Sequence, residues 1–134
     1  MVRYAGVYGL TLVAFLVIDL IWLGIVAKPF YDRQLGAMRA AEVNWGAAFL
    51  FYAIYVGGVL VLAVWPAFEA ESLGRALLLG GTLGLVAYAA FDLTSLAVLE
   101  GFPAGMVLPD MIWGTVLTAA TAAVGFGAAR WLLT

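Results

Sequence analysis

The chain has 134 residues, of which 66% are hydrophobic and 10% are charged, and its formal net charge is -2. Soluble domains carry about 25% charged residues, so we expect an integral membrane protein, and the acidic balance argues against a nucleic-acid partner. The absence of cysteine and histidine excludes disulfides, thiolate nucleophiles and imidazole bases from its chemistry.

Four apolar stretches are each long enough to cross about 30 Å of hydrocarbon as a helix. They cover approximately residues 4–27, 46–65, 76–99 and 109–133. Pro29 and Pro66 are expected to end the first two helices, and Pro109 is expected in the first turn of the fourth. The predicted fold class is therefore all-α: a four-helix transmembrane bundle forming one domain over residues 1–134, with both termini on one side.

The connection over residues 28–45 is the longest and most polar of the predicted connections. It carries three basic residues, Lys28, Arg33 and Arg39. Cytoplasmic loops of membrane proteins carry an excess of lysine and arginine, so we expect this connection in the cytoplasm. The tryptophans segregate to the two ends of the predicted bundle, as interfacial aromatic residues do.

One polar side chain from each span is predicted to reach the half of the bundle nearest residues 28–45. These side chains are Asp19, Asn44, Asp92 and Asp110. A carboxylate at the centre of a spanning helix costs about 2.5–3.5 kcal/mol, so residues of this kind are functional candidates. Asp19 has no hydroxyl side chain three or four positions away to serve as a local partner. Asp110 also fits a structural role at a helix N-terminus.

Small and polar residues recur at spacings of three and four in each span, which places them on one helix face. The third span has Gly80, Gly84, Tyr88 and Asp92 in this pattern, and the fourth has Asp110, Gly114, Thr118, Thr121 and Gly125. Gly57-Gly58 in the second span is another candidate for close helix packing. The pocket predicted between these faces is lined by Asp19, Trp22, Asn44, Tyr55, Tyr88, Asp92, Asp110 and Trp113.

Two short segments share the pattern Asp-x-Ile-Trp. They are DLIW at 19–22, late in the first span, and DMIW at 110–113, early in the fourth. This order does not fit a simple tandem duplication, and a chance match is a sufficient explanation in so apolar a sequence.

Four stretches of the chain resemble a known family. They are FLVIDLIWLGIVAKPFYDRQLG, NWGAAFLFYAIYVGG, VAYAAFDLTSLAVLEGFP and DMIWGTVLTA. The family consists of small bacterial membrane proteins and is catalogued only as a domain of unknown function, the 2177 family. The resemblance implies a four-helix protein of the bacterial inner membrane and leaves its activity open.

Three functions are compatible with these features. The first is a membrane-embedded binding or transport module, whose aspartates hold a cation, a proton or a cationic small ligand and whose aromatic rings suit organic cations. Transport through so thin a wall would require a homodimer. Another is an accessory subunit of a larger membrane complex, in which the polar stripes are interfaces with other subunits.

The remaining candidate function is a lipid-modifying enzyme. Asp19, Asp92 and Asp110 are the hard oxygen ligands that a divalent cation such as Mg²⁺ or Mn²⁺ prefers. Lys28 and Arg33 would then contact the phosphate of a lipid head group. No DxxD or DxxxD spacing is present, and the residues do not indicate a particular catalytic side chain.

Overall fold

Four long helices account for most of the structure, a computed structural model that describes residues 2–26, 28–36 and 44–134. Each is long and apolar enough to cross a membrane. They cover Val2–Ile25, Trp45–Glu69, Leu73–Val98 and Ala104–Leu133. The described residues contain no strand. The all-α, four-helix transmembrane fold predicted from the sequence is therefore confirmed.

The first two spans each contain a widened, π-helical turn. Helix α1 (Val2–Ile21) continues into such a turn at Trp22–Val26, and a short helix, α2 (Lys28–Leu35), follows. Helix α3 (Trp45–Val59) passes through a π-helical turn at Leu60–Val64 into α4 (Trp65–Glu69). The last two spans are the uninterrupted helices α5 (Leu73–Val98) and α6 (Ala104–Leu133).

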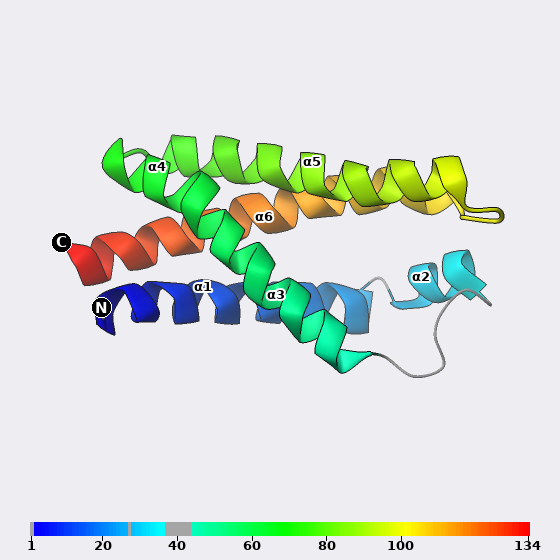
Figure 1. The fold of residues 1–134 in the computed structure, drawn as a ribbon, viewed down its shortest axis with the longest axis horizontal. Helices are drawn as coiled ribbons and strands as arrows, with labels where there is room; N and C mark the ends of the chain where they lie inside the picture. The colour runs from blue at the N-terminus through cyan, green and yellow to red at the C-terminus, as the bar shows by residue number, and fades with distance from the viewer. Residues whose placement is uncertain (1, 27, 37–43) are drawn as a thin grey trace.

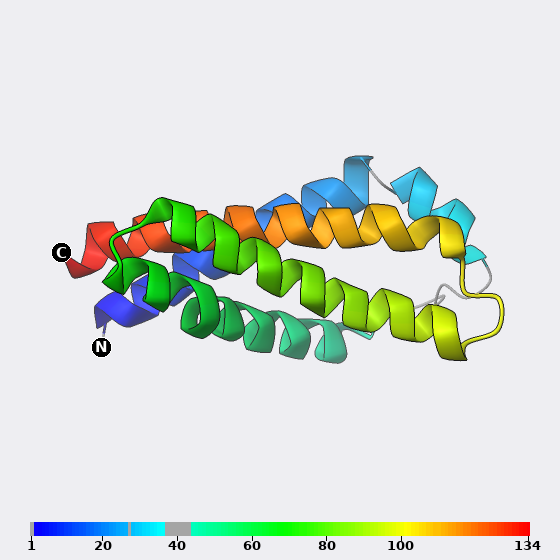
Figure 2. The same ribbon diagram turned by 90° about the horizontal axis from the view of Figure 1, so that it is seen from above.

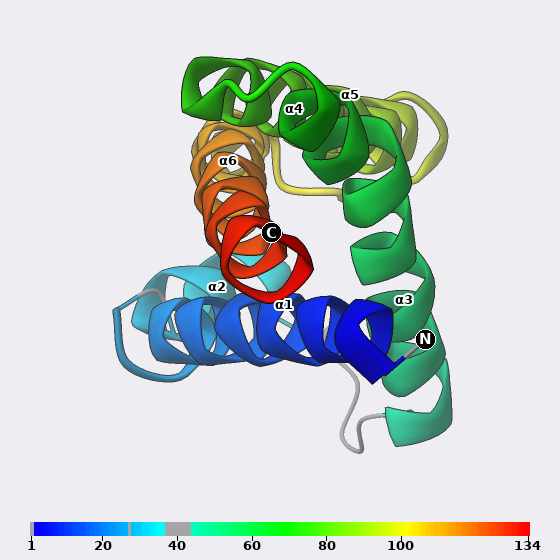
Figure 3. The same ribbon diagram turned by 90° about the vertical axis from the view of Figure 1, so that its left-hand side faces the viewer.

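Helix α6 lies between α1 and α5, and α3 crosses the bundle obliquely on one side (Figures 1 and 3). Both termini lie at one end, and α2 and the α5–α6 connection lie at the other (Figures 1 and 2). The buried core includes Val7 and Phe15 of α1, Val56 of α3 and Leu117 of α6, all 0% exposed. Large apolar side chains such as Leu78 and Val98 face outward, as in a protein surrounded by lipid.

Helices α5 and α6 touch through glycine. A Cβ atom added at Gly84 would lie 2.1 Å from the carbonyl oxygen of Gly114, and one added at Gly80 would lie 2.6 Å from Cβ of Ala122. Only glycine permits so close an approach, as at the small-residue interfaces of membrane helices. The close packing predicted from Gly80 and Gly84 is confirmed.

Gly57 and Gly58 do not behave in this way. A Cβ atom at either position would meet nothing within 4 Å. The prediction that this pair marks close helix packing is therefore wrong, because the face of α3 that packs inward carries Val56 and Val59.

Two prolines lie inside helical segments where the sequence predicted boundaries. The chain passes Pro66 and continues to the end of α4 at Glu69. In the preceding π-helical turn the Trp65 N–H donates to the Leu60 carbonyl, and such a widened turn accommodates a residue without an N–H. Pro109 lies inside α6, which already begins at Ala104. Both spans are therefore longer than predicted.

Candidate intramembrane binding site

Asp92 on α5 and Asp110 on α6 form a buried pair of carboxyl groups. Asp92 is 0% exposed and Asp110 is 8% exposed. The Asp110 carboxyl group is the neighbour of the Asp92 carboxyl group. No N–H or O–H donor of the described residues reaches either carboxylate oxygen of Asp92. Buried polar atoms are nearly always hydrogen-bonded, so an acceptor facing another acceptor requires a proton or a cation to join them.

The glycine contact between α5 and α6 places this pair. Gly84 lies two helical turns before Asp92, and Gly114 lies one turn after Asp110. The ring of Tyr88 lies over Gly114, since a Cβ atom there would be 2.2 Å from the ring. Because α5 and α6 approach closely at Gly84 and Gly114, their inner faces are also close at Asp92 and Asp110, and this holds the two aspartates together.

A cavity of about 260 Å³ opens beside the pair, between α3, α5 and α6. Its lining consists of Phe51, Tyr55, Ala87, Tyr88, Phe91 and Asp110. Asp110 is the one acidic residue of this lining, and four of the other five residues are aromatic. Phe51 is 46% exposed and Phe91 is 61% exposed, so these two rings stand at the outer rim, on the side of the surrounding lipid.

Tyr55 closes the inner part of the cavity. It is 9% exposed, and its hydroxyl group shares a 2.7 Å hydrogen bond with the Thr118 hydroxyl group on α6. Its ring stacks on Phe51 at a centroid distance of 5.2 Å and contacts Phe15 of α1 at 5.5 Å. The aromatic wall is thus anchored to two other helices.

Asp19 lies in a neighbouring part of the same half of the bundle. It is 6% exposed and accepts a 3.2 Å hydrogen bond from Nε1 of Trp113 on α6. The sequence showed no nearby hydroxyl group, and the structure supplies the partner from a distant helix. Asp19 therefore has a structural contact that the sequence did not reveal, and it does not line the aromatic cavity.

The two Asp-x-Ile-Trp segments meet in space. Trp22 stacks on Trp113 with a centroid distance of 4.3 Å and an interplanar angle of 9°, and Trp113 donates to Asp19. The repeated pattern thus builds one contact between α1 and α6. Trp22 and Trp113 are placed here, away from the cavity that Tyr55, Tyr88 and Asp110 line.

The three aspartates interact without forming a metal centre. Asp110 lies close enough to both Asp19 and Asp92 for electrostatic repulsion. Among the described residues no group of three or more acidic side chains is placed to hold a metal ion. The ligand set expected at Asp19, Asp92 and Asp110 for a divalent cation is therefore not assembled.

Three further predicted residues lie outside the cavity. Asn44 is exposed, and its side chain caps α3 by accepting a hydrogen bond from the Ala47 N–H at 3.1 Å. Its predicted place in the pocket is wrong, because the start of α3 diverges from the bundle. Lys28 and Arg33 are exposed residues of α2, beyond the end of α1. Arg39 lies outside the described residues.

Asp110 also differs from its expected position. The sequence suggested a helix N-terminus at Pro109, but α6 begins at Ala104 and has no acidic residue in its first turn. Asp110 is therefore a member of the carboxyl pair and not a capping residue. Phe51 and Phe91 complete the cavity. Sequence reasoning omitted both rings from the predicted pocket, although Phe51 precedes Tyr55 by one turn and Phe91 adjoins Asp92.

A protein-family model matches the part of the chain that contains all of these residues. The family model described as "Predicted membrane protein (DUF2177)" matches residues 4–127. The chain belongs to the DUF2177 family. No curated protein and no solved structure matches it. The DUF2177 match includes Asp19, Asp92 and Asp110, and it confirms both the family expected from the resemblance and the assignment as a membrane protein.

Proposed function

We propose that this DUF2177 protein is a membrane-embedded binding or transport module that takes a small organic cation at the Asp92–Asp110 pair, in exchange for a proton. The observation that supports this most strongly is the absence of a donor for the Asp92 carboxylate among the described residues. A second carboxyl group is its neighbour, and two adjacent carboxylates cannot both ionise without a compensating charge.

The cavity has the chemistry for an organic cation. Aromatic faces attract cations, with free energies of about 0.5–2 kcal/mol per contact that rise when water is excluded. Tyr55, Tyr88 and the rim phenylalanines provide such faces around Asp110. A volume of about 260 Å³ suits a small molecule. A bare Ca²⁺ ion takes about six to eight oxygen ligands, more than the Asp110 carboxylate and the two tyrosine hydroxyl groups of this lining supply.

The position of the cavity also favours a ligand that reaches it from the bilayer. Its rim residues Phe51 and Phe91 come from two spans, Trp45–Glu69 and Leu73–Val98, and both are exposed on the lipid side. An amphiphilic amine partitions into lipid with its charged group near the interface. We therefore propose such an amine as the ligand, in a bacterial inner membrane with residues 28–45 in the cytoplasm.

The proposal is tested with benzyltrimethylammonium, which combines an aromatic ring with a permanent positive charge. Its uncharged isostere, neopentylbenzene, serves as the control ligand. A ligand that binds only the folded state raises the free energy of unfolding by about 2.7 kcal/mol at 100 times its dissociation constant. The cation should therefore raise the unfolding temperature of the purified protein, and the isostere should not.

Matched variants locate the effect. Asp110→Asn should abolish stabilisation by the cation. Glu100→Gln removes a negative charge from an exposed residue in the connection between α5 and α6 and should leave the stabilisation unchanged. Equal stabilisation by both ligands, or full retention of the effect in Asp110→Asn, would refute the proposal.

A further inference from the structure

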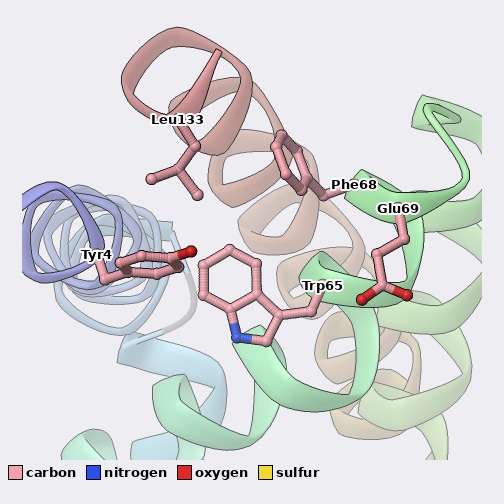
Figure 4. Close-up of a pocket in the computed structure, with 5 residues that line it drawn as sticks. All are labelled: Tyr4, Trp65, Phe68, Glu69 and Leu133. Carbon is pink, nitrogen blue, oxygen red and sulfur yellow. The ribbon is translucent and has the colours of Figure 1, made fainter. Parts of the chain in front are cut away.

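A second cavity lies at the opposite end of the bundle, beside the two termini. Its volume is about 290 Å³, and its lining residues are Tyr4, Trp65, Phe68, Glu69 and Leu133 (Figure 4). These residues come from the first turn of α1, from α4 and from the last turn of α6. The cavity is therefore formed where three spans end, at the level of the lipid head groups.

The aromatic residues form a connected wall. Trp65 contacts Tyr4 edge to face at a centroid distance of 5.6 Å and Phe68 at 6.5 Å. Trp65 is half-buried, whereas Trp131, near the same end, is 74% exposed. Exposure of that kind fits a simple interfacial anchor. Trp65 instead lines a half-open cavity.

A carboxylate and a guanidinium lie in adjoining cavities at this end of the bundle. Glu69 and Phe68 line both this cavity and an adjoining one of about 450 Å³, which is also lined by Glu71, Arg130 and Thr134. The Arg130 guanidinium carbon lies 5.8 Å from the centre of the Phe126 ring, a distance at which the ring restrains it. Anionic and cationic groups are thus presented side by side.

The C-terminal ends of two helices add partial negative charge to the cavity around Trp65. Helices α4 and α6 both finish at the cavity, with Glu69 and Leu133 as their last residues. The C-terminal end of a helix carries partial negative charge and favours a cation within the last turn. The aromatic cavity around Trp65 therefore suits an ammonium group, and the neighbouring Arg130 suits a phosphate.

We propose that these two adjoining cavities bind the head group of a zwitterionic aminophospholipid. The ammonium group occupies the space between Tyr4, Trp65 and Glu69, and the phosphate group contacts Arg130. Among the described residues, Glu69 lines both cavities and Arg130 is the one basic residue of either lining, so each charge of that head group has a partner, and the position of the cavities at the ends of the spans places it there. This site is independent of the carboxyl pair and does not rest on the function proposed for it.

The test measures binding of short-chain phosphatidylethanolamine to the purified full chain, with phosphatidylglycerol of the same acyl chains for comparison. Phosphatidylglycerol keeps the phosphate and lacks the ammonium group. We expect phosphatidylethanolamine to bind about tenfold more tightly, the ratio that 1.4 kcal/mol of ammonium recognition gives. Glu69→Gln and Trp65→Leu should each remove this preference.

Two controls make the result specific. Trp131→Leu removes a tryptophan near the same end that does not line the cavity, so it should retain the preference. If Trp65→Leu does not fold, Glu69→Gln alone tests the preference. Glu69 is exposed, and the glutamine side chain has the same shape, so this variant should fold. Equal affinity for the two lipids, or an unchanged preference in Glu69→Gln, would overturn the proposal. Soluble phosphoethanolamine binding as tightly as the lipid would overturn the assignment to a phospholipid.

Discussion

Replacing Asp92 by asparagine should stabilise the protein in the absence of ligand. The Asp92 carboxylate is fully buried and has no donor among the described residues. An asparagine at this position keeps the shape of the side chain and gains an N–H group that can donate to the Asp110 carboxyl group beside it. The wild-type pair must hold a proton at neutral pH, which costs about 1.4 kcal/mol for each pH unit above the pKa of a free carboxyl group, and the asparagine variant avoids this cost. We therefore expect the free energy of unfolding to rise by about 1–3 kcal/mol.

The assay is thermal unfolding in detergent at neutral pH, followed by tryptophan fluorescence. For a chain of this length 1 kcal/mol corresponds to roughly 3–4 °C, so the unfolding temperature should rise by about 3–12 °C. Glu100→Gln removes one negative charge from an exposed position near the end of α5 and should leave it unchanged. A decrease of more than about 1 kcal/mol in Asp92→Asn would contradict this expectation and favour a structural role for the Asp92 carboxylate, since loss of a native hydrogen bond produces decreases of that size.

Three further predictions concern packing and topology. Gly84→Ala should destabilise the bundle, because its Cβ atom would lie 2.1 Å from a backbone oxygen of α6; Gly57→Ala, with nothing within 4 Å, should stabilise it by about 0.5–1 kcal/mol in the same unfolding assay. Trp113→Phe removes the donor to Asp19 and should cost about 1–3 kcal/mol, whereas Asp19→Asn in the Trp113→Phe background should recover part of that loss. Single cysteines introduced in place of Gly36, Ala70, Ala104 and Thr134 should label in two pairs in intact vesicles, 36 with 104 and 70 with 134, and any mixed pattern would refute the topology.

The sequence predicts the bundle well because spanning helices must satisfy their own backbone hydrogen bonds in lipid. Length and hydropathy therefore identify four helices, and the glycines of α5 and α6 identify their closest contact. Pro66 and Pro109 suggested helix boundaries that are absent, and the reason is local in each case. A π-helical turn before Pro66 and the early start of α6 at Ala104 both keep the helix intact where a proline suggests a boundary.

The candidate site was predicted in part. The pattern of small and polar residues placed Asp92, Asp110, Tyr55 and Tyr88 on inward faces, and the structure brings these four together. Sequence periodicity gives the face of a helix but not its tilt. The oblique course of α3 (Figure 1) is therefore what separates Asn44 from the pocket and turns Phe51 into a rim residue.

The pairing of Asp19 illustrates the same limit. Its partner, Trp113, lies 94 positions further along the chain, and only the packing of α1 against α6 brings the two together. The sequence could identify a costly buried carboxyl group. It could not show that Asp19 has a donor while Asp92 has none among the described residues.

In the proposed exchange a cation displaces a proton held between Asp92 and Asp110. The most direct test of this exchange is to count the protons released when benzyltrimethylammonium binds to the protein in weakly buffered detergent solution containing a pH indicator. We predict about one proton released per cation bound by the wild-type chain, the number that charge neutrality at one carboxyl pair requires, and none from Asp110→Asn. Binding of the cation without release of a proton, or equal release from Asp110→Asn, would rule out this exchange.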